Sequence, residues 1–342
     1  MAYKGVLEDI RKCAALTRPG RIPVFAISEE FDVRVFGITY EAYCQDARKM
    51  AACQIAAIER FDYDWCWLQV DDCIEFEPLG VGTKGGETIV RATCDYLPPT
   101  RETLRRLRVP DPRKDGRMPL LLEAIATVKS HFGDTVCVTG RTAAPFSSVG
   151  LLYGLEELML LPLTNEDLLG DTLEFFVELQ TRFGVAQIEA GADAIWFGDC
   201  NASSHLVSPA IYQRFAFEPA RRVAEEYRKA GGLVFYHASE EGKSLPAMTE
   251  LGVSALSCGP GIDVNDALAV TRGKVCFMGN LDPIKVIQRG TPQDVERETL
   301  RIIQAGKQAG GFIFNSGEMI PRDTPEENIE TMIRTARQHG RW

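Results

Sequence analysis

A histidine at the end of a buried apolar run is the first candidate for chemistry in this sequence. His237 ends the run V-F-Y-H, whereas the other three histidines, His131, His205 and His339, fall in a polar helix end, a loop and the C-terminal tail. An imidazole in such a position is able to ligate a metal, to exchange a proton, or to serve as a hydrogen-bonded core group. The residue alone leaves all three roles open, and we predict that His237 is catalytic.

Acidic and amide side chains follow two other apolar runs. Asp199 and Asn201 come directly after D-A-I-W-F-G. Their side chains suit a ligand hydroxyl, a histidine that needs orienting, or the cap of a helix that begins near Pro209. We predict that Asp199 is catalytic and that Asn201 binds the substrate.

An adjacent acid pair, Asp71 and Asp72, ends a third run. Side chains alternate along a strand, so at most one of the two reaches the same side as His237, and Asp72 is our candidate for substrate binding. A carboxyl buried beside another acid would have a raised pKa, which suits proton transfer. Tyr236 and Asn315, at the ends of two further runs, are also predicted to contact the substrate.

Short β-type runs that alternate with helical patterns must position these side chains. Helical spacing of apolar residues covers Tyr40–Arg60, Asn165–Ala190 and Pro209–Ala230. The predicted strands are Ile22–Ser28, Trp65–Asp71, Thr135–Thr139, Asp193–Gly198, Leu233–His237, Ser254–Cys258, Val275–Gly279 and Phe312–Asn315. Aromatic residues on or beside these strands are able to wall a pocket, although strand aromatics more often belong to a core: Trp65, Trp67, Phe197, Tyr236 and Phe314.

Eight strand–helix units predict an α/β fold, a (β/α)8 TIM barrel that spans residues 1–342 as a single domain. The open doubly wound alternative would need a glycine-rich loop after the first strand, and S-E-E-F-D stands there instead. Residues 80–101 break the repeat and predict a short β-like excursion. In such a barrel the strand ends that carry the candidate residues meet at one face.

The net charge, the apolar stretches and the cysteines of the chain limit the partners and the location that we expect. A formal net charge of −10 argues against nucleic acid or an anionic membrane as the main partner. The most apolar stretch, Val149–Leu163, is short and contains Glu156 and Glu157, and the N-terminal residues lack the apolar core of a secretory signal. We therefore expect a cytoplasmic protein whose ten cysteines are thiols, none of them in a C-x-x-C pair.

An ordered set of motifs resembles the uroporphyrinogen decarboxylase superfamily. The C-terminal run G-F-I-F-N-S-G-E-M-I-P-R-D-T-P-E-E-N-I-E looks like the closing strand, I-P-x-D-T-P turn and final helix of that superfamily. Further similarity lies in Y-D-W-C-W-L-Q-V-D-D, G-R-T-A-A-P-F-S-S, the run Asp199–Phe215 and M-G-N-L-D-P from Met278. The resemblance covers almost the whole chain and implies the same barrel.

Two activities are implied by that resemblance: decarboxylation of uroporphyrinogen, and methyl transfer with a corrinoid protein. The decarboxylases carry an arginine-rich N-terminal segment that binds the carboxylates of the substrate. This chain has P-V-F-A-I-S-E-E-F-D at that place, and we expect its acids, Glu29 and Glu30, to repel a polyanionic porphyrinogen. The methyltransferase branch is therefore favoured, with a decarboxylase or lyase and a non-catalytic binding protein as alternatives.

Methyltransferases of the superfamily typically bind zinc through an H-x-C motif and a cysteine in a late G-C-G-I-P-like turn. This sequence keeps His237 but has Ser239 and Glu318 at the two cysteine positions. Glutamate is a competent zinc ligand, and Cys258 in L-S-C-G-P-G is available as a thiolate. We predict a zinc site formed by His237, Cys258 and Glu318. In the alternative the pocket is metal-free, and His237 and Glu318 act through protons or hydrogen bonds.

The ligand set also bears on the substrate. Zinc with a carboxylate ligand is a harder Lewis acid than zinc with two thiolates, and it fits an oxygen leaving group. We therefore predict O-demethylation of a small methoxylated donor, with zinc or a proton stabilising the leaving oxygen. The resemblance implies that a separate corrinoid protein is the partner, since the chain lacks the D-x-H-x-x-G cobalamin signature. The methyl donor, the acceptor and the direction of transfer are left open.

Overall fold

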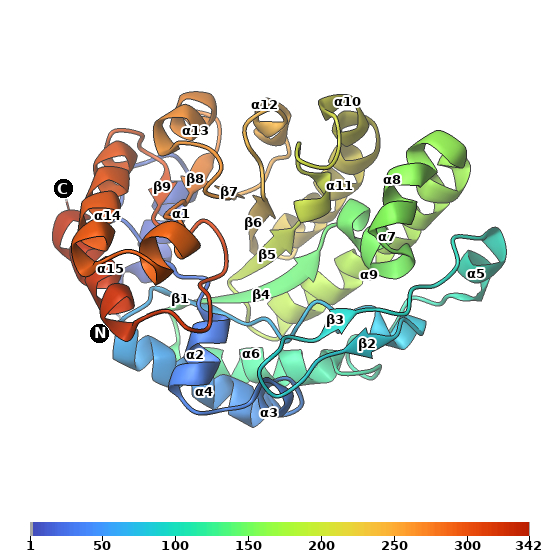
Figure 1. The fold of residues 1–342 in the computed structure, drawn as a ribbon, viewed down its shortest axis with the longest axis horizontal. Helices are drawn as coiled ribbons and strands as arrows, with labels where there is room; N and C mark the ends of the chain where they lie inside the picture. Colours follow the sequence, from blue (N-terminus) through green and yellow to red (C-terminus); the bar gives the residue numbers. More distant parts are fainter. Residues whose placement is uncertain (1–2, 342) are drawn as a thin grey trace.

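A curled parallel sheet surrounded by helices forms the body of the protein (Figure 1). The computed structural model describes residues 3–341. Its seven-stranded sheet has the order β1-β4-β5-β6-β7-β8-β9, with every neighbouring pair parallel. The strands are β1 (Trp65–Trp67), β4 (Cys137–Ala143), β5 (Ala194–Gly198), β6 (Leu233–Ala238), β7 (Ala255–Cys258), β8 (Cys276–Met278) and β9 (Phe312–Ile313).

The predicted first strand, Ile22–Ser28, closes the sheet without forming a regular strand. The Phe25 amide donates to the Phe314 carbonyl at 2.8 Å, and the Asp64 amide donates to the Val24 carbonyl at 3.0 Å. This segment therefore bridges β9 and the start of β1, which completes the eighth position of the TIM-barrel arrangement. Its ladder is sparse because Pro23 has no amide N–H and because the Ile27 amide donates to the Ser316 hydroxyl instead of to backbone.

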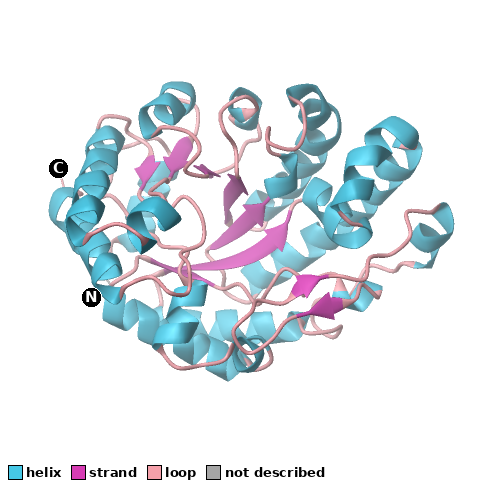
Figure 2. Ribbon diagram, in the orientation of Figure 1, coloured by secondary structure: helices cyan, strands magenta, loops and turns pink. Residues whose placement is uncertain are grey.

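Helices cover the outer face of the sheet (Figure 2). The predicted helix Asn165–Ala190 is confirmed as α9, and the predicted Tyr40–Arg60 is divided at Asp46, whose carboxylate caps the second part. The α-helices are α1 (Val6–Ala14), α2 (Glu29–Val35), α3 (Tyr40–Cys44), α4 (Ala47–Phe61), α5 (Arg101–Arg106), α6 (Met118–Phe132), α7 (Pro145–Tyr153), α8 (Leu155–Thr164), α9 (Glu166–Glu189), α10 (Pro209–Ile211), α11 (Phe217–Lys229), α12 (Leu245–Met248), α13 (Val264–Thr271), α14 (Pro292–Lys307) and α15 (Glu326–His339). Shorter turns are the 3-10 helices η1 (Glu77–Leu79) and η2 (Cys200–Ala202), and the π-helical η3 (Tyr212–Ala216) and η4 (Pro283–Gln288).

The predicted excursion is a small antiparallel hairpin. It pairs β2 (Thr83–Lys84) with β3 (Ala92–Thr93), and Figure 1 shows it at the edge of the barrel with α5 beyond it. In the described part of the chain, no single helix is long and apolar enough to span a membrane. The pair α7 and α8 passes that test only when the two are joined across a 112° bend.

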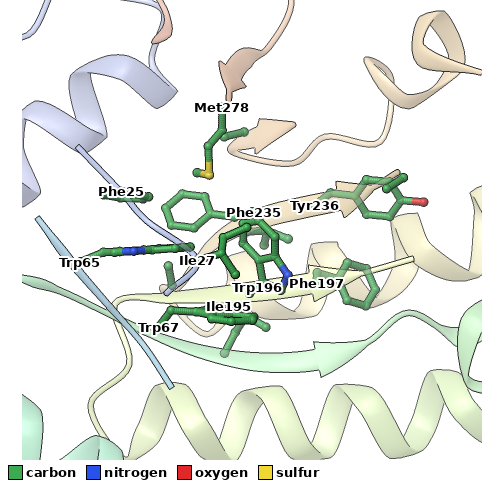
Figure 3. Close-up of a cluster of buried hydrophobic side chains, with 14 of the residues drawn as sticks. Phe25, Ile27, Trp65, Trp67, Ile195, Trp196, Phe197, Phe235, Tyr236 and Met278 are labelled. Carbon is green, nitrogen blue, oxygen red and sulfur yellow. The ribbon is translucent and has the colours of Figure 1, made fainter. Parts of the chain in front are cut away.

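Aromatic side chains fill the barrel interior (Figure 3). Phe25 stacks on Trp65 with ring centroids 4.3 Å apart, and Trp196 meets Trp65 and Trp67 edge-on at 5.6 and 5.9 Å. Trp65 and Trp67 share a face because side chains alternate along β1. This layer is buried, and it forms the floor beneath the polar residues at the strand ends.

Candidate active site

A cavity of about 250 Å³ lies at the carboxyl ends of the strands, where a TIM barrel carries its active site. Side chains from β1, β4, β5, β6 and the turn after β9 reach it. Its lining residues are Ile27, Trp67, Gln69, Asp72, Arg141, Ala143, Ser147, Leu151, Trp196, Gly198, Cys200, Asn201, His237, Glu318 and Met319. The predicted site residues Asp72, Asn201, His237 and Glu318 therefore come together.

His237 and Glu318 face each other in this cavity. The His237 Nε2 atom lies 3.3 Å from Glu318 Oε2, and the Ser239 hydroxyl donates to Glu318 Oε1 at 2.6 Å. The other ring nitrogen, Nδ1, lies 3.1 Å from the Ser257 hydroxyl. Both ring nitrogens and both carboxylate oxygens thus have partners. Ser239 thus holds one carboxylate oxygen while the other faces the imidazole.

The surroundings of His237 favour its charged form. Burial lowers the pKa of His237, but the neighbouring Glu318 carboxylate and Cys200 outweigh burial and raise the pKa to about 10. The Trp196 ring stacks on the imidazole with centroids 4.8 Å apart, which also suits a cation. Burial raises the pKa of Glu318, yet the facing imidazole leaves it lowered overall. Both pKa shifts favour an imidazolium that faces a carboxylate.

A glycine makes room for the glutamate. A methyl group at Gly259 would lie 3.1 Å from Glu318 Oε1, closer than ordinary van der Waals contact. A side chain at Gly259 would therefore require the Glu318 carboxylate to shift by a few tenths of an ångström.

Arg141 is the guanidinium that lines the cavity, and internal carboxylates already hold it. One nitrogen donates to Glu75 Oε2 at 3.0 Å, and another forms a short contact with Asp72. Burial raises the pKa of Glu75, and the attraction of Arg141 opposes that rise. Asp71 lies outside the cavity and pairs with Arg117 at 2.7 Å. One of the two acids therefore reaches the cavity, as expected, but β1 ends at Trp67, so Asp71 and Asp72 are separated by the turn that follows the strand and not by strand alternation.

Two predicted residues support the cavity from behind. Asp199 is fully buried and accepts hydrogen bonds from the Ser147 hydroxyl at 2.7 Å and from the Tyr236 hydroxyl at 2.8 Å. Burial raises the pKa of Asp199 to about 6. Tyr236 points away from the barrel interior, as Figure 3 shows, because its neighbour His237 points inward. Asp199 and Tyr236 thus hold Ser147, which lines the cavity, and do not line it themselves.

Asn315 is fully buried and lies outside the cavity lining. Neither its amide oxygen nor its amide nitrogen has a partner among the described residues. Of the aromatic residues that we proposed as walls, Trp67 lines the cavity. Trp65 belongs to the core layer below, and Phe197 contacts Tyr227 on the outer face of the sheet.

The predicted zinc ligands do not form a set. β6 and β7 pair His237 with Ser257 and Ala238 with Cys258, so the Cys258 side chain follows Ala238 to the other face of the sheet. Burial raises the pKa of the Cys258 thiol well above its usual range, which leaves it protonated. Within residues 3–341, no three His, Cys, Asp or Glu side chains converge as a metal site would require. His237 and Glu318 alone are fewer than the three protein ligands usual for catalytic zinc.

One argument from the sequence is corrected by burial. Glu29 was expected to present negative charge to a substrate, but its side chain is buried with both oxygens unpartnered among the described residues. Burial, and then the acid Asp71, raise the pKa of Glu29 well above its usual range. Burial therefore favours the uncharged form of Glu29, which weakens the repulsion expected from this side chain.

The sequence analysis did not select Gln69, Arg141, Ser147 or Cys200 as site residues, and all four line the cavity. The sequence did carry a signal for Gln69 and Arg141. Each is a polar residue in an otherwise apolar run. Each also lies an even number of positions from an inward aromatic or polar residue, and such residues share one face of a strand. Cys200 follows the end of β5, next to Asp199, which we did select.

Comparison with known proteins gives concordant matches along the chain. The family model described as Uroporphyrinogen decarboxylase (URO-D) matches residues 8–339. A methylcobamide:CoM methyltransferase of Methanosarcina acetivorans is 24% identical over 296 residues, covering 86% of this chain and 85% of the relative. A uroporphyrinogen decarboxylase of Aromatoleum aromaticum is 26% identical, with 85% and 83% covered. A solved methyltransferase structure from Methanosarcina mazei superposes with a TM-score of 0.88 at 21% identity, covering 97% and 98%, which confirms the fold.

Proposed function

The chain belongs to the uroporphyrinogen decarboxylase family, and on that basis we propose that it is a methyltransferase acting between a small molecule and a corrinoid held by a partner protein. Relatives named methylcobamide:CoM methyltransferase, alignable over most of both chains, support this choice. The observation that carries it is the His237–Glu318 pair in a small cavity at the barrel mouth. The pair is a proton donor placed where a leaving group would lie.

The size of the cavity supports a reaction in which this chain binds the small substrate and a partner protein holds the corrinoid. At about 250 Å³ it lies below the range usual for drug-sized ligands, so it suits a small molecule and is too small for a corrinoid ring. A corrinoid on a partner would supply the cobalt that receives or gives the methyl group. This chain's residues would bind the small substrate between Trp67, Leu151 and Met319.

Proton transfer is the step that we assign to the chain itself. The His237 imidazolium donates its Nε2 proton to the heteroatom that loses the methyl group, and Glu318 stabilises the imidazolium before the transfer. Such help benefits an oxygen leaving group most, because an alkoxide or phenoxide is a stronger base than a thiolate. A small methyl ether is therefore our preferred donor, and the argument for it rests on a proton and not on zinc.

The decarboxylase alternative receives less support from the cavity. Arg141 is the guanidinium available to a substrate carboxylate, and Asp72 and Glu75 already occupy it. A substrate with many carboxylates would need several free cations at this position. The test below separates the two activities.

The experiment is a spectroscopic assay with free cob(I)alamin and a panel of small methyl ethers, methylamines and methylthiols. Methyl transfer converts cob(I)alamin to methylcobalamin, which changes its visible spectrum. We expect turnover with an ether, and a loss of about 10²–10⁴-fold in His237→Gln, as removal of a general acid usually causes. Glu241→Gln, which removes an exposed carboxylate paired with His205, is the matched control and should keep full activity.

Release of carbon dioxide from uroporphyrinogen, with no reaction of cob(I)alamin toward any donor, would instead identify a decarboxylase. The same preparations should be analysed for zinc. We expect clearly less than one zinc per chain in the wild type, and a gain of zinc in the double variant Ser239→Cys, Glu318→Cys, which gives His237 two thiolate neighbours.

A further inference from the structure

A serine hydroxyl in the wall of the cavity has a fixed pattern of hydrogen bonds. Ser147 lies in the first turn of α7 and lines the cavity together with Leu151, one helical turn later. Its hydroxyl donates to Asp199 Oδ1 at 2.7 Å and accepts from the Asn201 backbone amide at 3.1 Å. A hydroxyl has one proton and two lone pairs, so a single lone pair of Ser147 is left for a further partner.

The carboxylate that takes the Ser147 proton is itself held in place. Asp199 is fully buried, and its Oδ1 atom also accepts from the Ser147 backbone amide at 3.1 Å. Its Oδ2 atom accepts from the Tyr236 hydroxyl at 2.8 Å. The start of α7 favours a negative charge at this position, because the dipole of a helix is positive at its N-terminus. Since a carboxylate accepts and does not donate, the Ser147 proton stays directed at Asp199, which does not line the cavity.

We propose that Ser147 is a specificity-determining residue that selects small substrates carrying a hydroxyl or N–H group, and that Asp199 is the residue that positions it. A donor on the substrate completes the hydrogen bonding of Ser147, whereas a group that cannot donate leaves the lone pair without a partner. For methyl transfer the preferred donor is then a methyl ether with a second, hydroxyl or amino, substituent. That assignment of the donor rests on the proposed function, but the binding preference itself does not.

The test compares how tightly the purified chain binds two small aromatic ethers, by ligand-observed NMR titration. One is meta-methoxyphenol, and the other is meta-fluoroanisole, in which a fluorine of similar size replaces the hydroxyl and cannot donate. We expect the wild type to bind the phenol about 3–10-fold more tightly, as one hydrogen bond usually contributes. Ser147→Ala should bring the ratio of the two dissociation constants close to one.

The neighbouring serine of the same helix is the matched control. Ser148 is also buried, but its hydroxyl donates to the Ala144 carbonyl at 2.9 Å and accepts from the Gln180 amide at 3.0 Å, and it does not line the cavity. Ser148→Ala therefore removes an equally buried hydroxyl and should keep the wild-type ratio. A ratio that is unchanged in Ser147→Ala, or that falls equally in Ser148→Ala, contradicts the proposal.

Two replacements of Asp199 test its positioning role. Asp199→Ala leaves the Ser147 hydroxyl in place but frees its proton, so the preference for the phenol should fall. Asp199→Asn keeps an oxygen that accepts from Ser147 and should restore the preference. Equal affinities of the wild type for the two ethers, or no saturable binding of either, overturn the proposal without any variant. No corrinoid enters this assay, so its failure and a failure of the proposed methyl transfer are distinguishable.

Discussion

At the scale of single residues, one imidazole in the cavity has polar or aromatic neighbours on three sides. Ser257 holds one ring nitrogen of His237, Glu318 faces the other, and Trp196 covers the ring. Each neighbour favours the protonated form or fixes its orientation. The Ser239 hydroxyl donates to Glu318 and so holds the carboxylate that faces the imidazole.

Replacing Glu318 tests the electrostatic part of this description. Although burial opposes the charged form, Glu318 is the main charge that raises the pKa of His237 to about 10, so Glu318→Gln should lower that pKa. The imidazole titration is measured by NMR of the ring protons. Glu241→Gln, which alters the exposed pair with His205, should leave the His237 titration unchanged. An unaltered His237 pKa in Glu318→Gln contradicts the assignment.

The raised pKa of a buried acid, Asp32, predicts how the unfolding free energy depends on pH. Burial raises the pKa of Asp32 from 3.8 to about 7, against hydrogen bonds from Ser28 and Tyr63 that lower it. Because the folded pKa is the higher one, the stabilisation is complete below about pH 4 and is lost as pH rises toward 7. A shift of this size corresponds to at most about 4 kcal/mol. Asp32→Asn should therefore flatten the fall in unfolding free energy between pH 4 and 7, measured by urea denaturation.

At the scale of elements, the packing of α9 against α11 depends on a missing side chain. Tyr227 of α11 lies over Gly184, and its hydroxyl donates to the Gln180 carbonyl at 2.7 Å. A methyl group at Gly184 would lie 2.2 Å from a Tyr227 ring carbon. α9 packs on β5 and α11 packs on β6, and those strands carry Trp196 and His237.

The same helix contains its own control. We expect Gly184→Ala to lower the unfolding free energy by about 1–3 kcal/mol, as overpacking does. Gly170 is also within α9, and a methyl group there meets nothing within 4 Å, so Gly170→Ala should raise stability by up to about 1 kcal/mol through helix propensity. Both values come from urea denaturation. Equal effects of the two substitutions would refute the packing argument.

At the scale of the whole molecule, the two ends of the chain are joined beneath the barrel. Arg337 of α15 contacts Asp64 at the start of β1 and donates to Asp62 at 3.2 Å, while Arg21 reaches the same Asp64 at 2.6 Å. Asp64 also accepts from the Val24 amide at 2.8 Å. This network locks the irregular first strand between β9 and β1, so it stabilises closure of the barrel.

Replacing Arg337, at the centre of this network, should lower the unfolding free energy more than replacing an exposed arginine that also pairs with α15. Arg337→Ala leaves a buried carboxylate under-compensated, and we expect a loss of about 3–5 kcal/mol. Arg60 of α4 also pairs with α15, through Glu326 and Glu330, but these groups are exposed, so Arg60→Ala should cost about 0–1 kcal/mol. Differential scanning calorimetry or urea denaturation measures both. Similar losses of unfolding free energy in the two variants would show that this network does not stabilise closure of the barrel.

The sequence by itself determined the architecture and the rim on which the site lies. Alternating strand and helix periods extend along the chain, and parallel strands end at one face, so Asp72, Asn201, His237 and Glu318 were bound to lie near one another. Both periods are local properties, which a single sequence displays directly. The motifs quoted from Tyr63 to Glu330 added the family, which the match over residues 8–339 confirms.

Only the tertiary structure decided which of the selected side chains share the cavity. Cys258 faces away from His237 because β6 and β7 pair His237 with Ser257, and this register depends on packing between distant segments. Tyr236 was excluded by its adjacency to His237, a rule of alternation that we applied to Asp71 and Asp72 but not there. The burial of Glu29 and the partners of Arg141 likewise arise from helices and loops far along the chain, because desolvation and charge pairing act through space.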